Sequence, residues 1–347
     1  MNLWLLFYCI VCCGIREVIS IEATSKRIAI CVSGQISRWQ PEFLFQNLIH
    51  VNPDQQLFLF FNLQMNNGTN HALHSSGIGF QPTKMSEMNN TEIQTHLNEL
   101  LNGSKHTEIV SINKHYVMSR EHFVTVVNGP LDRLKQFNMR DYHPSGISVN
   151  IMNMYQAHIN CADQILAYEQ EKTLEVNKNL TAWRFDYIIS TREDAYFYTP
   201  MNISALLPQL RLFHNPTPTT VAADDNHGKC DIIFKNCLTF GGFNMRLQLF
   251  NRDAGIIMLG NRFKFYSIMH HAGWKTVNPE CYEMMEADMY DVLSCRVEID
   301  YIPVTAARHL KDGDICLYDF ENRECYPNAV EENIKHIKKC EDIEKTI

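Results

Sequence analysis

The chain has 347 residues, of which 45% are hydrophobic and 20% charged, a composition typical of a globular protein and not of a disordered one. This length can bury one large core or two small ones, and we expect a single α/β domain of catalytic size. The net charge of −8, without a dense run of Lys or Arg, argues against a nucleic-acid partner, because nucleic-acid binding depends on clustered positive charge.

Residues 1–20 are typical of a secretory signal peptide. An apolar stretch runs from Leu3 to Ile15 and is closed by Arg16 and Glu17. Because a membrane-spanning helix needs about 20 apolar residues, we expect this leader to be cleaved. A short uncleaved anchor is the alternative, since no Lys or Arg precedes the stretch, and only then is a membrane a partner. Both routes lead to the lumen of the secretory pathway (ER or Golgi) or to secretion.

Glycosylation sequons and cysteines also indicate an oxidising lumen. Five N-x-[ST] sequons begin at Asn67, Asn89, Asn102, Asn179 and Asn202. Of the 12 cysteines, three lie in the leader, and seven of the remaining nine follow residue 229, so we expect disulfides mainly in the C-terminal half. Beyond the leader the chain has no C-x-x-C pair, which disfavours a zinc site.

The N-terminal part is predicted to open an α/β domain. The sequence KRIAICVSGQISRW indicates a buried strand over 27–32 and then a turn of Ser33, Gly34 and Gln35. In open α/β sheets such a turn lies at the carboxyl end of the strand, where ligands bind. Further strands are expected near 56–63 and 106–113, and a short helix near 92–101.

A change of periodicity marks a long amphipathic helix. Apolar residues recur at spacings of three and four from Ser148, the expected N-cap, to Glu169. His158 lies on the apolar face of this helix and is expected to be a packed core histidine. The next strand begins with Tyr187–Ile189 and runs into the charged residues 192–194.

The C-terminal part is predicted to contain two helices and further strands, one in CDIIFKNCLTF and the last near 297–304. We expect Asn244 to cap a helix that ends near Asn251. The sequence NPECYEMMEADMYDVL indicates a second helix that starts at Pro279, with Asn278 as its N-cap.

The charged residues after Tyr187–Ile189 suit a ligand that carries a diphosphate. Because alternate strand residues share a face, Arg192 and Asp194 are expected to point together and Glu193 to point away. At the carboxyl end of a strand a carboxylate can hold a divalent cation, and a neighbouring arginine can clamp phosphate oxygens. A surface salt-bridge ladder is the alternative interpretation of the same residues.

Four segments follow one another in the order RIAICVSGQ, MNMYQAHINCADQILAYEQ, FDYIISTREDAYFYTP and CDIIFKNCLTFGGFNMR. This order resembles a group of eukaryotic GT-A-like glycosyltransferases found in plants, algae and protists, over roughly residues 27–315. The resemblance implies an α/β fold with a GT-A-like (Rossmann-like) mixed sheet flanked by helices, and sugar transfer from a nucleotide sugar. We expect one such domain over 26–316 and a charged C-terminal tail over 317–347.

The resemblance also assigns residues to the donor site. Asp194 falls where such enzymes place the last carboxylate of the D-x-D metal motif, which implies Mn²⁺ or Mg²⁺. Arg192 stands in the place of the first carboxylate, and this departure leaves metal dependence open. His309 is a second candidate metal ligand. The other donor-binding candidates are Ser33, Gly34 and Gln35 on the nucleotide side and Gly241, Gly242 and Asn244 near the donor sugar.

Transfer with inversion also needs a base that deprotonates the acceptor hydroxyl. The candidates are Asp231, Glu280 and Glu283. Glu280 lies in the first turn of a predicted helix, where the helix dipole favours a carboxylate in any case.

The leading hypothesis is a glycosyltransferase that moves a sugar from a nucleotide sugar to a glycan or glycoprotein acceptor. The alternative hypothesis is a catalytically silent secreted protein that binds carbohydrate or has a structural role on the same scaffold.

Overall fold

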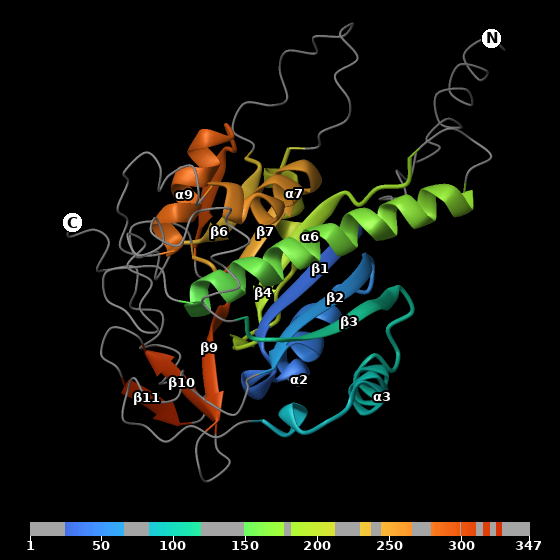
Figure 1. Ribbon diagram of the computed structural model, residues 1–347, viewed down its shortest axis with the longest axis vertical. Helices are drawn as coiled ribbons and strands as arrows, with labels where there is room; N and C mark the ends of the chain where they lie inside the picture. Colours follow the sequence, from blue (N-terminus) through green and yellow to red (C-terminus); the bar gives the residue numbers. More distant parts are fainter. Residues whose placement is uncertain are drawn as a thin grey trace, which may run out of the picture.

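The computed structural model describes residues 25–65, 83–118, 149–176, 182–211, 230–236, 244–265, 279–298, 300–309, 315–319 and 324–327. These residues form a seven-stranded sheet with helices on both faces and a smaller four-stranded sheet (Figure 1). The helices are α2 (Pro41–Leu44), α3 (Asn90–Leu100), α6 (Val149–Val176), α7 (Arg252–Gly260) and α9 (Pro279–Met289). Short helical turns are η1 (Ile36–Arg38), η2 (Phe45–Ile49), η4 (Lys84–Ser86), η5 (Ile203–Ala205) and η6 (Leu207–Gln209).

The larger sheet is mixed and has the strand order β3-β2-β1-β4-β7-β6-β8. Its strands are β1 (Arg27–Gln35), β2 (Gln56–Met65), β3 (Thr107–Tyr116), β4 (Tyr187–Arg192), β6 (Ile232–Lys235), β7 (Leu247–Asn251) and β8 (Ser294–Val297). All run parallel except β7, which pairs antiparallel with β4 and β6. The carboxyl ends of the parallel strands therefore share one edge. This mixed sheet flanked by helices belongs to the α/β class that the sequence predicts.

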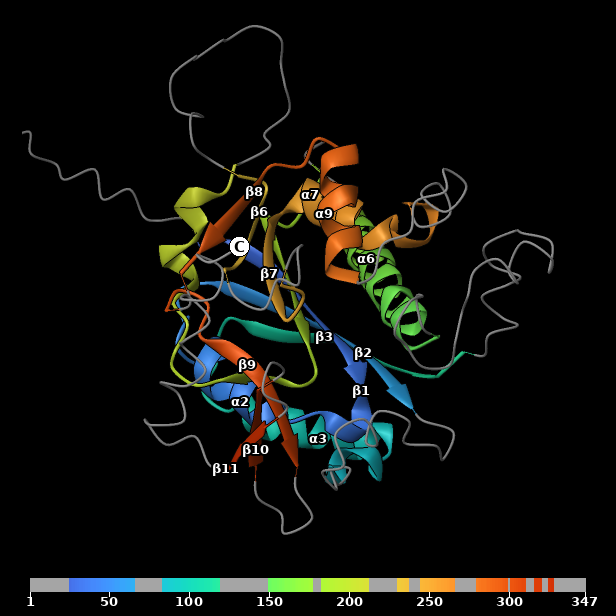
Figure 2. The same ribbon diagram turned by 90° about the vertical axis from the view of Figure 1, so that its left-hand side faces the viewer.

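Side chains of alternate strand positions build a core on each face of this sheet. Ile28, Ile30 and Val32 of β1 pack in a cluster with α2 and α3, whereas Ala29 and Cys31 pack in a cluster with α6, α7 and α9. Figures 1 and 2 show α6 lying across one face with α7 and α9 beside it. Because successive strand residues point to opposite faces, β1 is buried on both, which accounts for its continuous apolar run.

The second sheet is antiparallel and has the order β11-β10-β9-β5. Its strands are β5 (Ala195–Phe197), β9 (Val304–His309), β10 (Ile315–Asp319) and β11 (Glu324–Pro327). The fully buried Lys235 at the end of β6 joins the two sheets, since its Nζ donates to the Val304 carbonyl (2.7 Å). The predicted domain end at residue 316 lies inside β10, and β11 lies in the residues assigned to the tail. Strand pairing, which composition does not reveal, joins β10 to β9 and β11 to β10.

Side-chain caps fix where two of the helices begin. Before α3, the Asn89 side chain accepts a hydrogen bond from the Glu92 amide (3.0 Å), and the Glu92 carboxylate accepts one from the Asn89 amide (2.7 Å). Before α7, the Asn251 side chain accepts a hydrogen bond from the Ala254 amide (2.9 Å). The predicted helix from Asn244 to Asn251 is therefore wrong. Its second half is β7, which is fully buried between β4 and β6.

The other predicted elements occur with shifted ends. The strands near 27–32, 56–63 and 106–113 are β1, β2 and β3, and the helix near 92–101 is α3. The predicted turn of Ser33, Gly34 and Gln35 is wrong, because these residues continue β1 and pair with β2. The long helix continues past Glu169 to Val176, and α9 begins at Pro279 as predicted. The last strands, predicted over 297–304, are shifted. β8 ends at Val297 and β9 begins at Val304, so most of the predicted range lies between the two strands. Ser148 and Asn278 lie outside the described residues.

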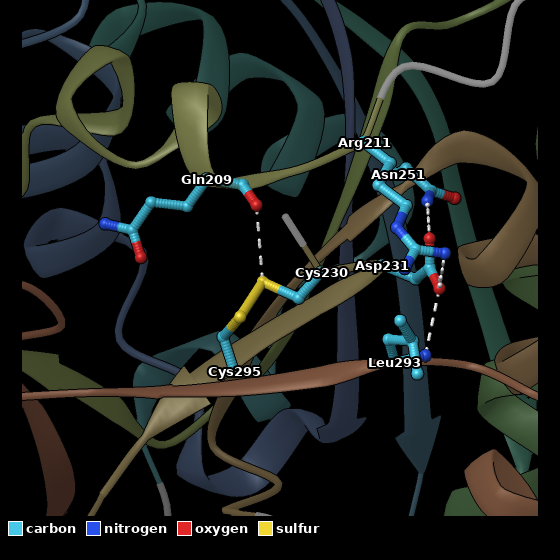
Figure 3. Close-up of a disulfide and its surroundings, with 7 residues drawn as sticks. All are labelled: Gln209, Arg211, Cys230, Asp231, Asn251, Leu293 and Cys295. Atoms are coloured by element: carbon cyan, nitrogen blue, oxygen red, sulfur yellow. Dashed lines mark hydrogen bonds and ion pairs between the residues drawn. A yellow bond between two sulfur atoms is a disulfide. The ribbon is translucent and has the colours of Figure 1, made fainter. Parts of the chain in front are cut away.

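Two disulfides cross-link distant parts of the chain. Cys31 in β1 is bonded to Cys161 in α6, at a sequence separation of 130, and Cys230 beside β6 is bonded to Cys295 in β8 (Figure 3). The first fixes the long helix to the centre of the larger sheet. Because stable disulfides form in oxidising compartments, both are compatible with a lumenal or secreted protein. Within the described ranges, no helix is long and apolar enough to cross a membrane.

Removing the Cys31–Cys161 cross-link by the double change Cys31→Ser and Cys161→Ser is expected to lower the free energy of unfolding by about 2–5 kcal/mol, because the long loop it closes restricts the unfolded chain. Urea denaturation of the variant and the oxidised wild type measures the difference. Reduction of the Cys31–Cys161 bond should lower the stability of the wild type to that of the variant, which has no such bond to lose. Equal stabilities of oxidised variant and wild type would contradict the bond.

Candidate functional site

A cavity of about 160 Å³ lies at the carboxyl edge of the larger sheet. It is lined by Ser33, Gly34, Gln35, Arg38, Gln64, Ile151, Met154, Arg192 and Glu193. The parallel register places Ser33 of β1 beside Arg192 of β4 and Gln35 beside Gln64 of β2. The start of α6 supplies the apolar wall. The carboxyl end of β1 and the charged end of β4, far apart in sequence, therefore meet in one cavity.

Arg192 and Asp194 form a bidentate ion pair. Nε of Arg192 donates to Oδ1 of Asp194 (3.0 Å), and Nη2 donates to Oδ2 (3.1 Å). The Asp194 side chain is fully buried, whereas that of Arg192 is 23% exposed and lines the cavity. The two side chains lie together, as strand alternation predicts, but they are hydrogen-bonded to each other. The arginine and not the aspartate faces the cavity.

Glu193 is also directed inward, so the expectation that it points away is wrong. β4 ends at Arg192, and the following turn breaks the alternation of faces on which that expectation depended. The Glu193 amide donates to the Ser33 carbonyl (3.0 Å), and its carboxylate forms an ion pair with Arg38 of η1. Its side chain is 1% exposed. No sequence pattern marked Arg38 as a site residue, although it lies only three residues after Gln35.

Gly34 allows the Glu193 carboxylate to occupy this position. Its φ of +139° lies in a region that L side chains rarely adopt. A Cβ atom at position 34 would collide with the Glu193 carboxylate. The carboxylate therefore packs directly on the glycine backbone, and glycine is required here for both conformation and space.

Ser33 contributes a buried polar group without a partner. The residue is 1% exposed, and its Oγ has no hydrogen-bond partner among the described residues. A buried hydroxyl left unpaired costs free energy, so a site of this kind is ready to bind a ligand oxygen or nitrogen. Together with the guanidinium groups of Arg38 and Arg192, it gives the cavity the donors that an anionic ligand needs.

Glu280 lies at the first turn of α9, near the same edge. Burial raises the pKa of Glu280 to about 7; its own backbone amide and the charges of Arg192 and Arg246 oppose this rise, and repulsion by Glu283 adds to it. Arg192 and Arg246 therefore lie close enough to act on this carboxyl. A group that titrates near neutral pH can accept and release a proton under ordinary conditions.

Glu283 belongs instead to a buried ionic network behind the cavity. Its carboxylate contacts Arg262 (2.5 Å) and accepts a hydrogen bond from Gln248 of β7 (2.5 Å), and Arg262 also donates to Glu286 (2.8 Å). Burial raises the pKa of Glu283 and Glu286, the latter to about 8, against the opposing charge of Arg262. Because its oxygens are engaged and fully buried, Glu283 holds α9 against the sheet and is not placed to reach an acceptor.

His158 of α6 borders this network and is 1% exposed, as expected for a core histidine. Burial lowers its pKa well below the usual value, and the charges of Arg262 and Arg192 lower it further. The imidazole is therefore neutral. Both Arg262 of the network and Arg192 of the cavity therefore lie close enough for their charges to act on His158.

Asp231 lies away from the other candidates. It precedes β6, so it sits at the amino edge of the larger sheet, beside the Cys230–Cys295 disulfide (Figure 3). Its oxygens accept hydrogen bonds from the Asn251 side chain (2.7 Å) and the Leu293 amide (2.9 Å). The structure therefore gives Asp231 a role in joining chain segments and does not bring it to the cavity.

The remaining candidates are only partly described. Gly241 and Gly242 lie outside the described residues, and His309 ends β9, where its backbone pairs with Ile315. Asn244 is 1% exposed, and its side chain accepts a hydrogen bond from the Arg246 amide (3.0 Å). The Arg246 carbonyl in turn accepts one from the Arg192 amide (3.1 Å), so this segment supports the end of β4.

The described residues do not fit the divalent cation that the D-x-D resemblance implies. Both oxygens of Asp194 accept hydrogen bonds from Arg192. Within the described ranges, no group of three or more His, Cys, Asp or Glu side chains could hold a metal ion. The guanidinium of Arg192 occupies the position where the D-x-D pattern has its first metal-binding carboxylate.

Comparison with known proteins finds no matching protein-family model and no matching curated sequence. Among solved structures, mouse xyloside xylosyltransferase 1 in its apo form is similar at 9% identity and a TM-score of 0.33, over 79% of this chain and 85% of that one. The 4-diphosphocytidyl-2C-methyl-D-erythritol synthase of Anaerococcus prevotii is similar at 9% identity and a TM-score of 0.31, over 90% and 97%. The nucleoside-diphosphate-sugar pyrophosphorylase of Vibrio cholerae is similar at 10% identity and a TM-score of 0.31, over 80% and 94%. Likeness at these TM-scores carries no argument about function.

Gly34→Ala is expected to destabilise the protein more than Gly103→Ala. Both glycines have positive φ (139° and 95°), but only at position 34 would the added Cβ meet a buried carboxylate. Overpacking of this kind costs about 1–3 kcal/mol beyond the backbone strain that both changes share. Urea denaturation of the two variants measures the difference. Equal losses would contradict the placement of Glu193 against Gly34.

Glu286→Gln is expected to flatten the fall of stability with pH. The unfolded carboxyl titrates near 4.5 and the folded one near 8, so between these values the folded state binds a proton that the unfolded state lacks. The contribution of Glu286 to the free energy of unfolding is therefore fully present below pH 4.5. It is lost as pH rises toward 8, by at most about 1.4 kcal/mol per pH unit. Urea denaturation from pH 5 to 8.5 measures the slope. Asp288→Asn, an exposed residue of the same helix, is the control, and parallel slopes for wild type and Glu286→Gln would refute the expectation.

Proposed function

We propose that this protein is a glycosyltransferase that binds a nucleotide sugar at the carboxyl edge of β1, β2 and β4. The observation that carries the proposal is the cavity in which the end of β1, Ser33–Gln35, meets Arg38 and Arg192. A diphosphate is bound by positive charge and by backbone and hydroxyl donors, and this cavity offers all three. Ligands of open α/β sheets bind at the same edge.

The residues of the cavity edge suggest a division of roles. Arg192 and Arg38 would stabilise the negative charge that develops on the departing diphosphate. Glu280, with a pKa of about 7, fits the base that an inverting transfer requires. It would take the acceptor proton while the acceptor oxygen bonds to the anomeric carbon and the bond from that carbon to the diphosphate breaks. No step in this scheme runs through a metal ion, because the guanidinium groups supply the neutralising charge.

The acceptor is proposed to be a glycan or glycoprotein in the lumen of the secretory pathway. The two disulfides, which suit an oxidising compartment, support this location.

Arg192→Met is expected to lower the rate of donor turnover roughly 100-fold, because one preorganised charged donor at the diphosphate is lost. The purified chain is assayed for hydrolysis and transfer across a panel of UDP- and GDP-sugars, with and without EDTA. Arg27→Met, at the amino end of β1, is the matched control. EDTA should leave the activity intact. If no nucleotide sugar binds or turns over in either condition, the proposal is wrong; loss of turnover with EDTA alone would instead assign a divalent cation to the site.

A catalytically silent carbohydrate-binding protein is the second candidate. The bidentate Arg192–Asp194 pair favours it, because the carboxylate is engaged by the arginine instead of facing the cavity. Glycan-array binding without any nucleotide, unchanged by Asp194→Asn, would support this candidate over the transferase.

A further inference from the structure

Arg192 and Arg38 each form a close ion pair at the cavity, with Asp194 and Glu193 respectively, and Arg38 also makes a longer contact with Asp194 (3.9 Å). Arg192 faces the cavity while its partner Asp194 is buried behind it, so a ligand can reach the cation without meeting the anion. In the Arg38–Glu193 pair, both members line the cavity. Because the Glu193 side chain is only 1% exposed and is held by Arg38, a bound anion that pairs with Arg38 would have to replace the Glu193 carboxylate.

The Glu193 carboxylate occupies the features of this cavity that suit a phosphate group. It pairs with the Arg38 guanidinium, and it packs against the backbone of Gly34, where a side chain would otherwise stand. Guanidinium groups and exposed glycine backbone are the common protein partners of phosphate oxygens. A carboxylate can take the same contacts, because it also presents acceptor oxygens to a guanidinium.

We propose that Glu193 is an internal competitor of the donor diphosphate, and that its ion pair with Arg38 sets the affinity of the site for nucleoside diphosphates. This inference rests on the proposed function. Without a ligand, Glu193 keeps Arg38 paired, which avoids the cost of leaving a buried charge alone. When a diphosphate enters, it takes over Arg38, and Glu193 must leave the Gly34 backbone. The displacement weakens nucleotide binding and favours release of the nucleoside diphosphate after transfer.

The two members of the pair should therefore change nucleotide affinity in opposite directions. Glu193→Gln removes the competing charge at nearly constant volume and is expected to lower the Kd of UDP or GDP roughly tenfold. Arg38→Met removes the group for which both anions compete and is expected to raise the Kd by at least a similar factor. If the pair only stabilised the fold, both changes would weaken binding alike.

Isothermal titration of UDP and GDP into the purified full chain measures these constants. Glu87→Gln, an exposed glutamate outside the cavity, is the matched control and should leave the Kd unchanged. Thermal unfolding of each variant checks folding, and Glu193→Asp, which keeps the charge but shortens its reach, should give an intermediate Kd if Glu193→Gln does not fold. If the wild type binds UDP or GDP but Glu193→Gln or Glu193→Asp binds no more tightly, this inference is wrong and the proposed function still stands. Absence of binding by the wild type and every Glu193 variant overturns the proposed function and this inference with it.

Discussion

The parallel pairing of β1 with β4 is the interaction on which the candidate site depends. Its register places Ser33 opposite Arg192, and it continues beyond the strands through the hydrogen bond from the Glu193 amide to the Ser33 carbonyl. Two segments separated by most of the N-terminal half of the chain are thereby locked together. The cavity, the inward turn of Glu193 and the requirement for Gly34 all follow from this pairing.

Charge balance is the second constraint at this edge. Removing an ion from water costs several kcal/mol, so buried charges are retained where partners offset the cost. Arg192 is paired with Asp194, Arg38 with Glu193, and Arg262 with two glutamates of α9. The arginines are thus held in fixed positions before any ligand arrives. Such preorganisation is what a site for an anionic ligand needs, since the ligand does not have to order the side chains itself.

Glu280 and Glu283 show how one helix can give two carboxyl groups different roles. Both belong to α9, and the pKa of each is raised by burial. Glu283 is committed to Arg262 and Gln248 inside the protein, whereas Glu280 lies at the partly buried start of the helix, where the charges of Arg192 and Arg246 act on it. The buried network fixes the helix, and the helix in turn places Glu280 at the edge of the sheet that carries the cavity.

The sequence by itself determined the α/β class, most strands and helices, and the presence of a charged cluster at a strand end. These follow from local patterns: apolar runs, spacings of three and four, and a helix-starting proline at Pro279. The tertiary structure decided which charged groups meet. Strand alternation could not predict Glu193, because β4 stops one residue before it, and no local pattern marks Arg38 as its partner. Asp231 was equally plausible in sequence, but the direction of β6 places it at the opposite edge of the sheet. Strand direction and pairing are set by contacts between distant segments, and local sequence does not record them.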